Sequence, residues 1–239
     1  MCWFCGCNTK ITKTYKPVHG YVAALLTEIE GTLGKLPADK SFSVSHIHFG
    51  GGSPTILKAE DLRAIMAAIR ERLHILDDAE IAIEMDPRTA TDDFMEAMIE
   101  CGFNRASIGI QDFDPEVQQA IGRLQSFEVT RRCVDQLRAE GVTSLNTDLV
   151  YGLPHQTMAR LEDTIDKTLS LAPDRVALFG YAHVPWVAKR QKLIREATLP
   201  DAVARYHFAE KAAARFAASG IPLLSRETAA APVTKVKTP

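Results

Sequence analysis

The sequence has 239 residues and a mass of 26.3 kDa, which suits one large domain or two small ones, and its 46% hydrophobic and 24% charged residues are an ordinary globular mixture. That composition excludes wholesale disorder and a fibrous repeat. The formal charge of −2 gives no reason to expect nucleic acid or an anionic membrane as a partner. No apolar run has the roughly 18–20 residues of a membrane span, and MCWFCGCNTK lacks the features of a signal peptide, so we expect a cytoplasmic protein.

Hydrophobic periodicity predicts helices and strands in regular alternation along the chain. In chain order, we expect helices over residues 21–33, 58–73, 91–101, 114–121, 126–140, 157–171 and 201–218, and strands over residues 43–49, 79–85, 105–110, 144–151 and 175–181. Glycines end three of these helices, at Gly102, Gly141 and Gly220. Five strands that alternate with helices are typical of a parallel α/β sheet or barrel.

The end of the sequence does not continue this pattern. Residues 225–239 (SRETAAAPVTKVKTP) are small, polar and proline-containing, without a periodicity that would form a core. We therefore predict one domain over residues 1–220 and a disordered tail over residues 221–239.

Three of the five cysteines, Cys2, Cys5 and Cys7, lie within the first seven residues, while Cys101 and Cys133 are isolated. So dense a cluster in a reducing compartment indicates metal or redox chemistry rather than a disulfide framework. Spacing alone is compatible with zinc, with an iron–sulfur cluster or with a redox pair. No second Cys/His pair follows at zinc-ligand spacing, and this favours an iron–sulfur cluster.

Polar residues gather where the predicted strands end, and in parallel α/β folds these ends form the binding edge. The strand ends supply Gly50, Gly51, Gly52 and Ser53; Glu84, Asp86 and Arg88; Gln111 and Asp112; Asn146, Asp148 and Tyr151; and Tyr181 and His183. We therefore predict a binding site at this edge of the sheet. The glycine run either lets a ligand approach bare backbone or forms a tight turn, and it has neither the lysine of a phosphate-binding loop nor the spacing of a dinucleotide fingerprint.

Several of these residues have alternative explanations. Glu84 and Asp86 should point to the same side of one strand, but Glu84 could instead form a salt bridge or cap a helix. Asp112 could cap the helix that follows it. His46 and His48 alternate on one strand in the manner of metal ligands, although core or supporting positions are favoured.

Taken together and in order, six motifs resemble the oxygen-independent coproporphyrinogen III oxidases, which are radical S-adenosylmethionine (SAM) enzymes of haem biosynthesis. The motifs are CWFCGC, HFGGGSPT, IEMDPR, SIGIQDF, NTDLVYGLPHQT and FGYAHVP, and the resemblance runs from Cys2 to about Gly220. It implies an α/β fold: a partial radical-SAM (β/α)6 barrel, similar to a TIM barrel, that lacks its first strand in this chain. It also implies that residues 221–239 are foreign to the family.

The resemblance also implies the cofactors and the residues that bind them. In this family, three cysteines of a CxxxCxxC motif hold a [4Fe–4S] cluster whose fourth iron is chelated by SAM, and two SAM molecules are bound. Cys2 and Cys5 match the second and third cluster ligands, Cys7 matches an additional cysteine that is not a ligand, and Phe4 lies beside the SAM adenine. The remaining SAM-binding positions correspond to Gly51, Gly52, Ser53, Glu84, Gln111, Arg123, Asp148 and Ala182.

The implied reaction is the oxidative decarboxylation of coproporphyrinogen III to protoporphyrinogen IX. The reduced cluster cleaves SAM, the resulting radical abstracts hydrogen from a propionate side chain, and loss of carbon dioxide and an electron leaves a vinyl group. A separate electron donor would reduce the cluster, and we expect a monomer.

This sequence departs from the family pattern at both ends. The first cysteine of CxxxC and the first strand would lie upstream of Met1, and the matching stops at about half of the usual length. We therefore expect an inactive fragment that does not assemble a stable cluster by itself. Two alternatives remain: a haem- or SAM-binding relative without oxidase activity, and a zinc-binding α/β domain.

Overall fold

Six parallel strands form one sheet in the computed structural model, which describes residues 2–7, 12, 14–37 and 39–226. The strands are β1 (Ser43–Phe49), β2 (His74–Met85), β3 (Arg105–Gln111), β4 (Ser144–Tyr151), β5 (Arg175–Gly180) and β6 (Leu223–Arg226). They lie in the sheet in the same order as in the sequence, so β1 and β6 each pair with one neighbour. This is the curled, open α/β arrangement of a partial barrel, as predicted.

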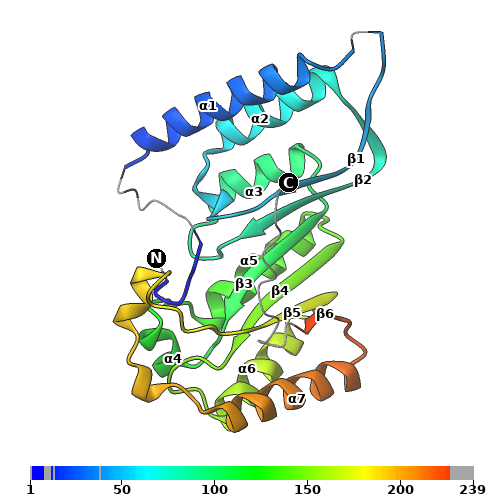
Figure 1. Cartoon of the computed structure of the whole chain (residues 1–239). Coiled ribbons are helices and arrows are strands. Elements are labelled where there is room, and N and C mark those ends of the chain that lie inside the picture. Colours follow the sequence, from blue (N-terminus) through cyan, green and yellow to red (C-terminus); the bar gives the residue numbers. More distant parts are fainter. Residues whose placement is uncertain (1, 8–11, 13, 38, 227–239) are drawn as a thin grey trace, which may run out of the picture.

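Helices connect the strands and cover the outer face of the sheet (Figure 1). They are α1 (Lys16–Leu33), α2 (Ala59–Arg72), α3 (Asp92–Glu100), α4 (Pro115–Ala120), α5 (Phe127–Ala139), α6 (Met158–Ser170) and α7 (Ala202–Ala218), with short 3-10 turns at η1 (Pro54–Ile56), η2 (Lys189–Leu193) and η3 (Glu196–Thr198). Helices α1 and α2 pack side by side at the β1 end of the sheet, and α6 and α7 do so at the β5 end (Figure 1).

Local signals in the loops set where these helices begin and end. Side chains of Thr91, Ser126, Thr157 and Asp201 each accept a hydrogen bond from a backbone N–H in the first turn of α3, α5, α6 and α7. Gly102, Gly141 and Gly220 follow helix ends with φ angles of 82°, 92° and 74°. Since a left-handed backbone at this position favours glycine, the three predicted helix stops are confirmed.

Most element boundaries agree with the predictions, and β1 and β4 agree residue for residue. Strand β2 begins at His74 and is longer than expected. The prediction started later because the acidic residues Asp77 and Asp78 interrupt the apolar alternation in this part of the strand. Helix α1 begins at Lys16, five residues earlier than expected, with Pro17 in its first turn, where proline is tolerated.

The predicted boundary after residue 220 is wrong for the residues that directly follow it. Leu223–Arg226 form β6, which pairs in parallel with β5 through Val176↔Leu223 and Leu178↔Arg226. The ordered sheet therefore continues into the segment that was predicted to be a disordered tail. Residues 227–239, the rest of that predicted tail, lie outside the described residues.

The main core lies between the sheet and its outer helices, and it includes Ile83, Phe94, Ile108, Leu145 and Phe216, all almost fully buried. The opposite, inner face of the sheet is polar. Cross-strand pairing aligns Glu84 with Ser107, Ser107 with Asn146, and Asn146 with Arg175, so these four residues form one row across β2 to β5. In the part of the chain that the structure describes, no helix is both long and apolar enough to span a membrane.

Candidate functional site

A cavity of about 620 Å³ opens at the carboxyl ends of the strands. Ten of the eleven residues predicted as cofactor or cluster ligands line it: Cys2, Phe4, Cys5, Gly51, Gly52, Ser53, Glu84, Gln111, Arg123 and Asp148. These residues come from the N-terminal segment, from the loop after β1, from β2, β3 and β4, and from the segment that follows α4. The fold therefore brings residues from distant parts of the sequence to one site, as expected for the carboxyl edge of parallel strands.

The N-terminal cysteine segment is fixed to this edge through its backbone and its two aromatic residues. The Trp3 N–H donates to the Ile121 carbonyl at 2.8 Å, and the Gln191 amide donates to the Phe4 carbonyl at 2.9 Å. Gly122 has a φ of 64°, and a Cβ there would lie 2.7 Å from the Trp3 indole nitrogen, so only glycine leaves room for the ring. Trp3 and Phe4 also pack against a small apolar cluster that includes Ile121 and Tyr181.

Two arginines surround the sulfur of Cys2, which is buried with 7% exposure. Arg123 Nη1 lies 3.4 Å from this sulfur and Arg88 Nη2 lies 3.8 Å from it. Asp86 holds both guanidinium groups: it accepts from Arg88 Nε and Nη2 at 2.9 and 2.6 Å and from Arg123 Nη1 at 3.4 Å. Burial tends to raise the pKa of Asp86, but Arg88 and Arg123 outweigh it and hold that pKa below its usual value, so the carboxyl is ionised at neutral pH.

Glu84 fixes the glycine turn that follows β1. Its Oε2 accepts a hydrogen bond from the Gly51 N–H at 3.0 Å, and its Oε1 lies 3.6 Å from His48 Nε2. Gly51 and Gly52 have φ angles of 74° and 65°, which disfavour other residues. A Cβ at Gly50 would lie 2.5 Å from the His48 ring. The glycine run is therefore a tight turn, and it lies at the edge of the cavity.

Asp148 lies beside Ser107 and Asn146 on the inner face. Ser107 Oγ is 3.2 Å from each carboxylate oxygen of Asp148, and Asn146 Nδ2 donates to Asp148 Oδ1 at 2.8 Å and to Ser107 Oγ at 2.7 Å. Burial, assisted by the nearby negative charge of Glu84, raises the pKa of Asp148 to about 6, although the two hydrogen-bonding side chains and Arg123 lower it. Asp148 is thus an acid that titrates close to neutrality within the cavity.

Gln111 stands at an irregular point of β3, where the pairing with β4 shifts between Gly109 and Gln111. Its φ of 72° is in the left-handed region that non-glycine residues rarely adopt. Its side-chain amide folds back over Gly109, where a Cβ would lie 2.9 Å from Gln111 Nε2. Such local strain is typical of functional positions, and here it redirects the end of β3 toward the cavity.

A buried network beneath Arg123 was not predicted from the sequence. Gln118 and Gln125 exchange hydrogen bonds, with Gln125 N–H donating to Gln118 Oε1 at 2.9 Å and Gln118 Nε2 donating to the Gln125 carbonyl at 2.6 Å. The Gly109 carbonyl accepts from Gln125 Nε2 at 3.1 Å and from Arg123 Nη2 at 2.5 Å. Gln118 lies in α4 but Gln125 lies in the segment after that helix, so no local pattern indicated that they meet.

Three predictions need correction or completion. Ala182 does not line the cavity: it is exposed, and its carbonyl accepts from the same Gln191 amide that holds Phe4, at 3.1 Å. His46 and His48 are exposed on the edge strand rather than in the core, and His48 supports Glu84. Asp112 does not cap α4; Asp114 does, and the Asp112 carboxylate is fully buried among donors from Asp114, Gln156 and Thr164.

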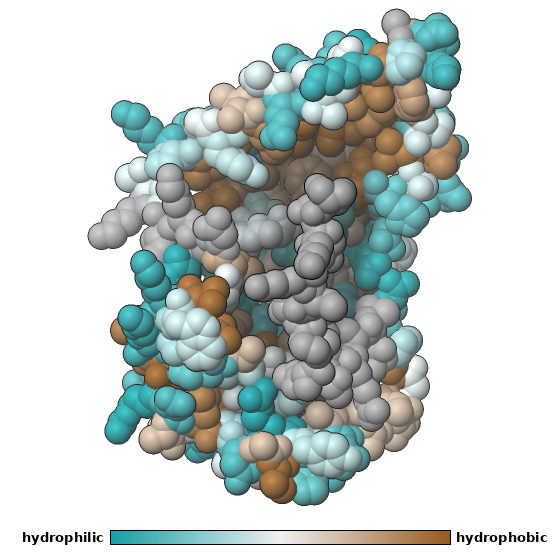
Figure 2. All heavy atoms as spheres, in the orientation of Figure 1, coloured by the Kyte–Doolittle hydropathy of each residue, from teal (hydrophilic) through white to brown (hydrophobic). Residues whose placement is uncertain are grey.

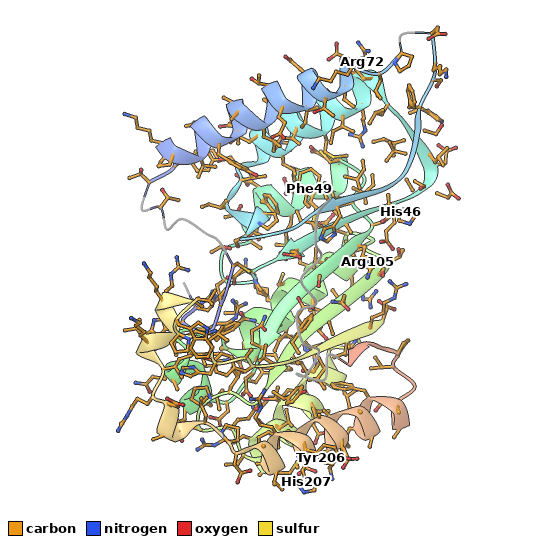
Figure 3. All side chains as sticks on the ribbon, in the orientation of Figure 1. His46, Phe49, Arg72, Arg105, Tyr206 and His207 are labelled. Carbon is orange, nitrogen blue, oxygen red and sulfur yellow. The ribbon has the colours of Figure 1, made fainter. Side chains whose placement is uncertain are left out.

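One wall of the cavity is apolar and lies under the helices at the β1 end of the sheet. It is made by Tyr21, Leu25, Phe49, Ile56, Leu57 and Ile65. Figure 2 shows hydrophobic side chains on the underside of the layer that α1 and α2 form, where the surface is hollowed. Phe49, at the end of β1, lies beneath these helices and packs edge-to-face on Phe103 (Figure 3). The cavity therefore joins a polar strand edge to an apolar wall, a combination suited to a ligand that carries both kinds of group.

The cysteines fit an iron–sulfur cluster only in part. Cys2 and Cys5 line the cavity, whereas Cys7 is exposed and its N–H donates to the Cys5 sulfur at 3.4 Å. Among the described residues, no group of three His, Cys, Asp or Glu side chains is arranged to hold a metal. Thiolates are the usual ligands of these clusters, so the described residues supply two ligands where the predicted motif has three.

Comparisons with known proteins decide the family. The model of the radical SAM superfamily matches residues 1–168. The chain belongs to the radical SAM superfamily. Membership implies a [4Fe–4S] cluster and SAM as cofactors, which agrees with the cavity cysteines and with the glycine turn beside them.

Within this superfamily, the chain is most usefully compared with three proteins. It is 52% identical over 220 residues to "Coproporphyrinogen III oxidase, anaerobic 1" of Cereibacter sphaeroides and 47% identical over 220 residues to the oxygen-independent coproporphyrinogen III oxidase of Paracoccus denitrificans, with 92% of this chain and 48% of each relative covered. The solved coproporphyrinogen III oxidase HemN from Escherichia coli superposes with a TM-score of 0.87 and 36% identity, over 92% of this chain and 50% of that one. The chain thus spans about half the length of the curated relatives it matches.

Proposed function

We propose that this chain is the SAM- and cluster-binding part of an oxygen-independent coproporphyrinogen III oxidase. The observation that carries this proposal is the convergence of Cys2 and Cys5 with the glycine turn and with the cavity residues Glu84 and Asp148. Relatives that are named as coproporphyrinogen III oxidases match 92% of the chain. The proposed reaction is the oxidative decarboxylation of coproporphyrinogen III to protoporphyrinogen IX, with a separate electron donor.

Each group of residues has a distinct task in this proposal. Cys2 and Cys5 would hold two irons of the cluster, with Arg88 and Arg123 beside the Cys2 sulfur. The cluster and SAM, when bound, supply the one-electron chemistry that starts the reaction. The Gly51–Glu84 contact would fix the glycine turn beside the ligand, and the carboxylates of Glu84 and Asp148 would accept hydrogen bonds from its hydroxyl or ammonium groups.

We also propose the finer features of the predicted site: two SAM molecules, a Phe4 position beside the adenine, and Ala182 as a SAM-binding residue. Phe4 supports this because it lines the cavity while its carbonyl is held by Gln191. The apolar wall under α1 and α2 supports a second, bulkier ligand than one nucleoside, because a tetrapyrrole offers a broad apolar face together with carboxylates.

A pair of variants on β2 tests the SAM-binding part of the proposal. Glu84→Gln keeps the size of the side chain but removes the charge next to Gly51, so we expect S-adenosylhomocysteine to bind about tenfold more weakly by isothermal titration calorimetry. Glu80→Gln is the control, since Glu80 lies on the same strand but pairs with Arg105 outside the cavity. Equal losses in the two variants, or no binding by the unaltered chain, would contradict the proposal.

Anaerobic reconstitution with iron and sulfide tests the cluster part. Because the described residues supply two cavity thiols, we expect less than one [4Fe–4S] cluster per chain by iron analysis and EPR, and no protoporphyrinogen from coproporphyrinogen III. A full-occupancy signal with SAM cleavage would overturn this expectation. Binding of S-adenosylhomocysteine without any cluster would support the second candidate function, a SAM-binding relative without oxidase activity.

A further inference from the structure

Ser107 and Asn146 have not been given a role, although both contact Asp148. They belong to the row that also contains Glu84 and Arg175, which crosses the inner face from β2 to β5. Ser107 lines the cavity beside Asp148, and Asn146 lies behind it with 5% exposure. The positions of these two side chains are therefore set by strands of the sheet, which hold side chains more precisely than loops do.

The direction of the hydrogen bonds shows what Asn146 does. It directs its amide hydrogens at Ser107 Oγ and Asp148 Oδ1, at 2.7 and 2.8 Å. Its own carbonyl oxygen is buried and has no partner among the described residues. A buried acceptor without a partner costs stability. The arrangement therefore provides hydrogen bonds for the Asp148 carboxylate while the Asn146 carbonyl oxygen stays without one in the described part of the chain.

We propose that Asn146 and Ser107 are positioning residues for Asp148, and that they hold its carboxylate ionised and aimed into the cavity, where it accepts hydrogen bonds from the hydroxyl or ammonium groups of an S-adenosyl compound. This inference rests on the proposed function for the identity of the ligand. It goes beyond that function because it assigns a task to two residues that do not need to contact the ligand themselves.

The charges around Asp148 explain why it needs such support. Burial raises its pKa to about 6, and the negative charge of Glu84 on β2 acts in the same direction. Ser107 on β3, Asn146 on β4 and Arg123 after α4 lower the pKa, while the neighbouring inner-face residue of β5 is the uncharged Ala177. Without the two donors, the pKa of Asp148 would rise further, since hydrogen bonds to an ionised carboxylate stabilise the charged form.

Ligand binding through Asp148 should depend on pH. Because the folded chain holds Asp148 at a raised pKa, its ionised form predominates only above about pH 6. Loss of a donor should move this transition to higher pH, and binding that requires the ionised form should weaken near neutrality but recover in alkaline solution. A variant that merely disturbed the fold would weaken binding at every pH.

The experiment compares four variants of the full chain with the unaltered protein. Asn146→Leu and Ser107→Ala remove the donors, Ser107→Thr retains the hydroxyl, and Thr147→Val is a control on the opposite face of β4, where the Thr147 hydroxyl is buried without a partner among the described residues. The dissociation constants of S-adenosylhomocysteine and of adenosine are measured at pH 6.5, 7.0 and 8.5. Carbon-13 NMR of the Asp carboxyls follows the titration of Asp148 directly, with Asp148→Asn to assign its signal.

We expect Asn146→Leu and Ser107→Ala to raise the Asp148 transition above pH 6, to weaken binding about fivefold at pH 7.0, and to weaken it less than twofold at pH 8.5. Ser107→Thr and Thr147→Val should behave like the unaltered chain. If Asn146→Leu and Ser107→Ala weaken the binding of S-adenosylhomocysteine but not that of adenosine, the ammonium group is the partner of Asp148. If they weaken the binding of both probes equally, the partner is a ribose hydroxyl.

Two results would overturn the inference: an Asp148 titration that is the same in Asn146→Leu, Ser107→Ala and the unaltered chain, or equal weakening of binding at pH 7.0 and 8.5. The two proposals fail separately. If the unaltered chain binds neither probe, the proposed function fails, while the carboxyl titration still decides whether Asn146 and Ser107 keep Asp148 ionised.

Discussion

At the scale of single residues, Asp112 is a buried acid whose charge should make stability depend on pH. Its side chain is fully buried, and burial raises its pKa to about 6, although donors from Asp114, Gln156 and Thr164 lower it. The folded state therefore binds this proton more tightly than the unfolded state, where a carboxyl has its ordinary pKa near 4. The stability that Asp112 contributes is complete below about pH 4 and is lost as the pH rises through about 6.

The prediction concerns the difference in unfolding free energy between the unaltered chain and Asp112→Asn. Between pH 4.5 and pH 7.5, we expect the unfolding free energy of the unaltered chain to fall by about 2 kcal/mol relative to that of Asp112→Asn, because the amide of the variant does not titrate. Urea unfolding followed by circular dichroism measures it. Any constant loss of hydrogen bonds in Asp112→Asn cancels, since only the change with pH is compared. A difference that stays flat, or that grows with pH, contradicts the prediction.

Asp174→Asn is the matched control, because the pKa of Asp174 moves in the opposite direction. Burial tends to raise this pKa, but the Leu145 N–H and the Arg138 guanidinium outweigh it and hold it below its usual value. Its stability contribution is present above about pH 4 and is lost only as the pH falls further. The difference between the unaltered chain and Asp174→Asn should therefore change little between pH 4.5 and pH 7.5.

The residue scale also shows where reading the sequence succeeded. Glu84 lies in β2 and Asp86 directly follows that strand, and their separation by one residue predicted that both would face the site, as the structure confirms. The contact between Arg123 and the Cys2 sulfur was not accessible in this way, because it joins residues 121 positions apart and depends on how the N-terminal segment returns to the sheet. Side-chain chemistry could be predicted locally, but partners distant in the sequence could not.

At the scale of elements, the turn that carries Arg123 depends on one glutamine of α4. Gln118 makes hydrogen bonds to the Asp112 carbonyl at 2.8 Å and to the backbone carbonyl and N–H of Gln125 at 2.6 and 2.9 Å. Gln118→Leu would leave these buried groups without partners, so we expect a loss of about 3 kcal/mol in unfolding free energy and weaker binding of S-adenosylhomocysteine. Gln119→Leu is the control, because Gln119 is exposed on the same helix and should change stability by less than about 0.5 kcal/mol. Equal losses of unfolding free energy in Gln118→Leu and Gln119→Leu would show that the effect comes from disturbing helix α4 in general and not from losing the Gln118–Gln125 contact.

Elements with strong local signals were predicted well, and those without them were not. Strand β4 has eight residues and its predicted bounds are correct, whereas β6 has only the four residues Leu223–Arg226, which are too few to show a strand pattern. Its place in the sheet is set by backbone pairing with β5, which no local composition indicates. The beginning of α1 was missed for a related reason, since Lys16 and Pro17 carry no apolar periodicity.

At the scale of the whole molecule, the order of the strands follows from local units. Each strand is joined to the next through a helix, and such connections place consecutive parallel strands side by side, so the sequential order from β1 to β6 was predictable in outline. The openness of the sheet was expected only from the resemblance. Among the described residues, the sheet ends in an unpaired strand edge at β1 and at β6, and the two edges differ, since β1 has seven residues and β6 has four.

An unpaired strand edge invites pairing with a second molecule, and the longer β1 edge should do so first. We expect a monomer at low concentration and association at high concentration, which light scattering coupled to size-exclusion chromatography would detect. Ser45→Lys places a charge on the exposed edge of β1 and should suppress this association. Ala24→Lys adds the same charge at an exposed position of α1 and should not. If both variants suppress association equally, net charge and not the β1 edge controls it; if neither does, the molecules associate through another surface, and the apolar wall of the cavity becomes the next region to alter.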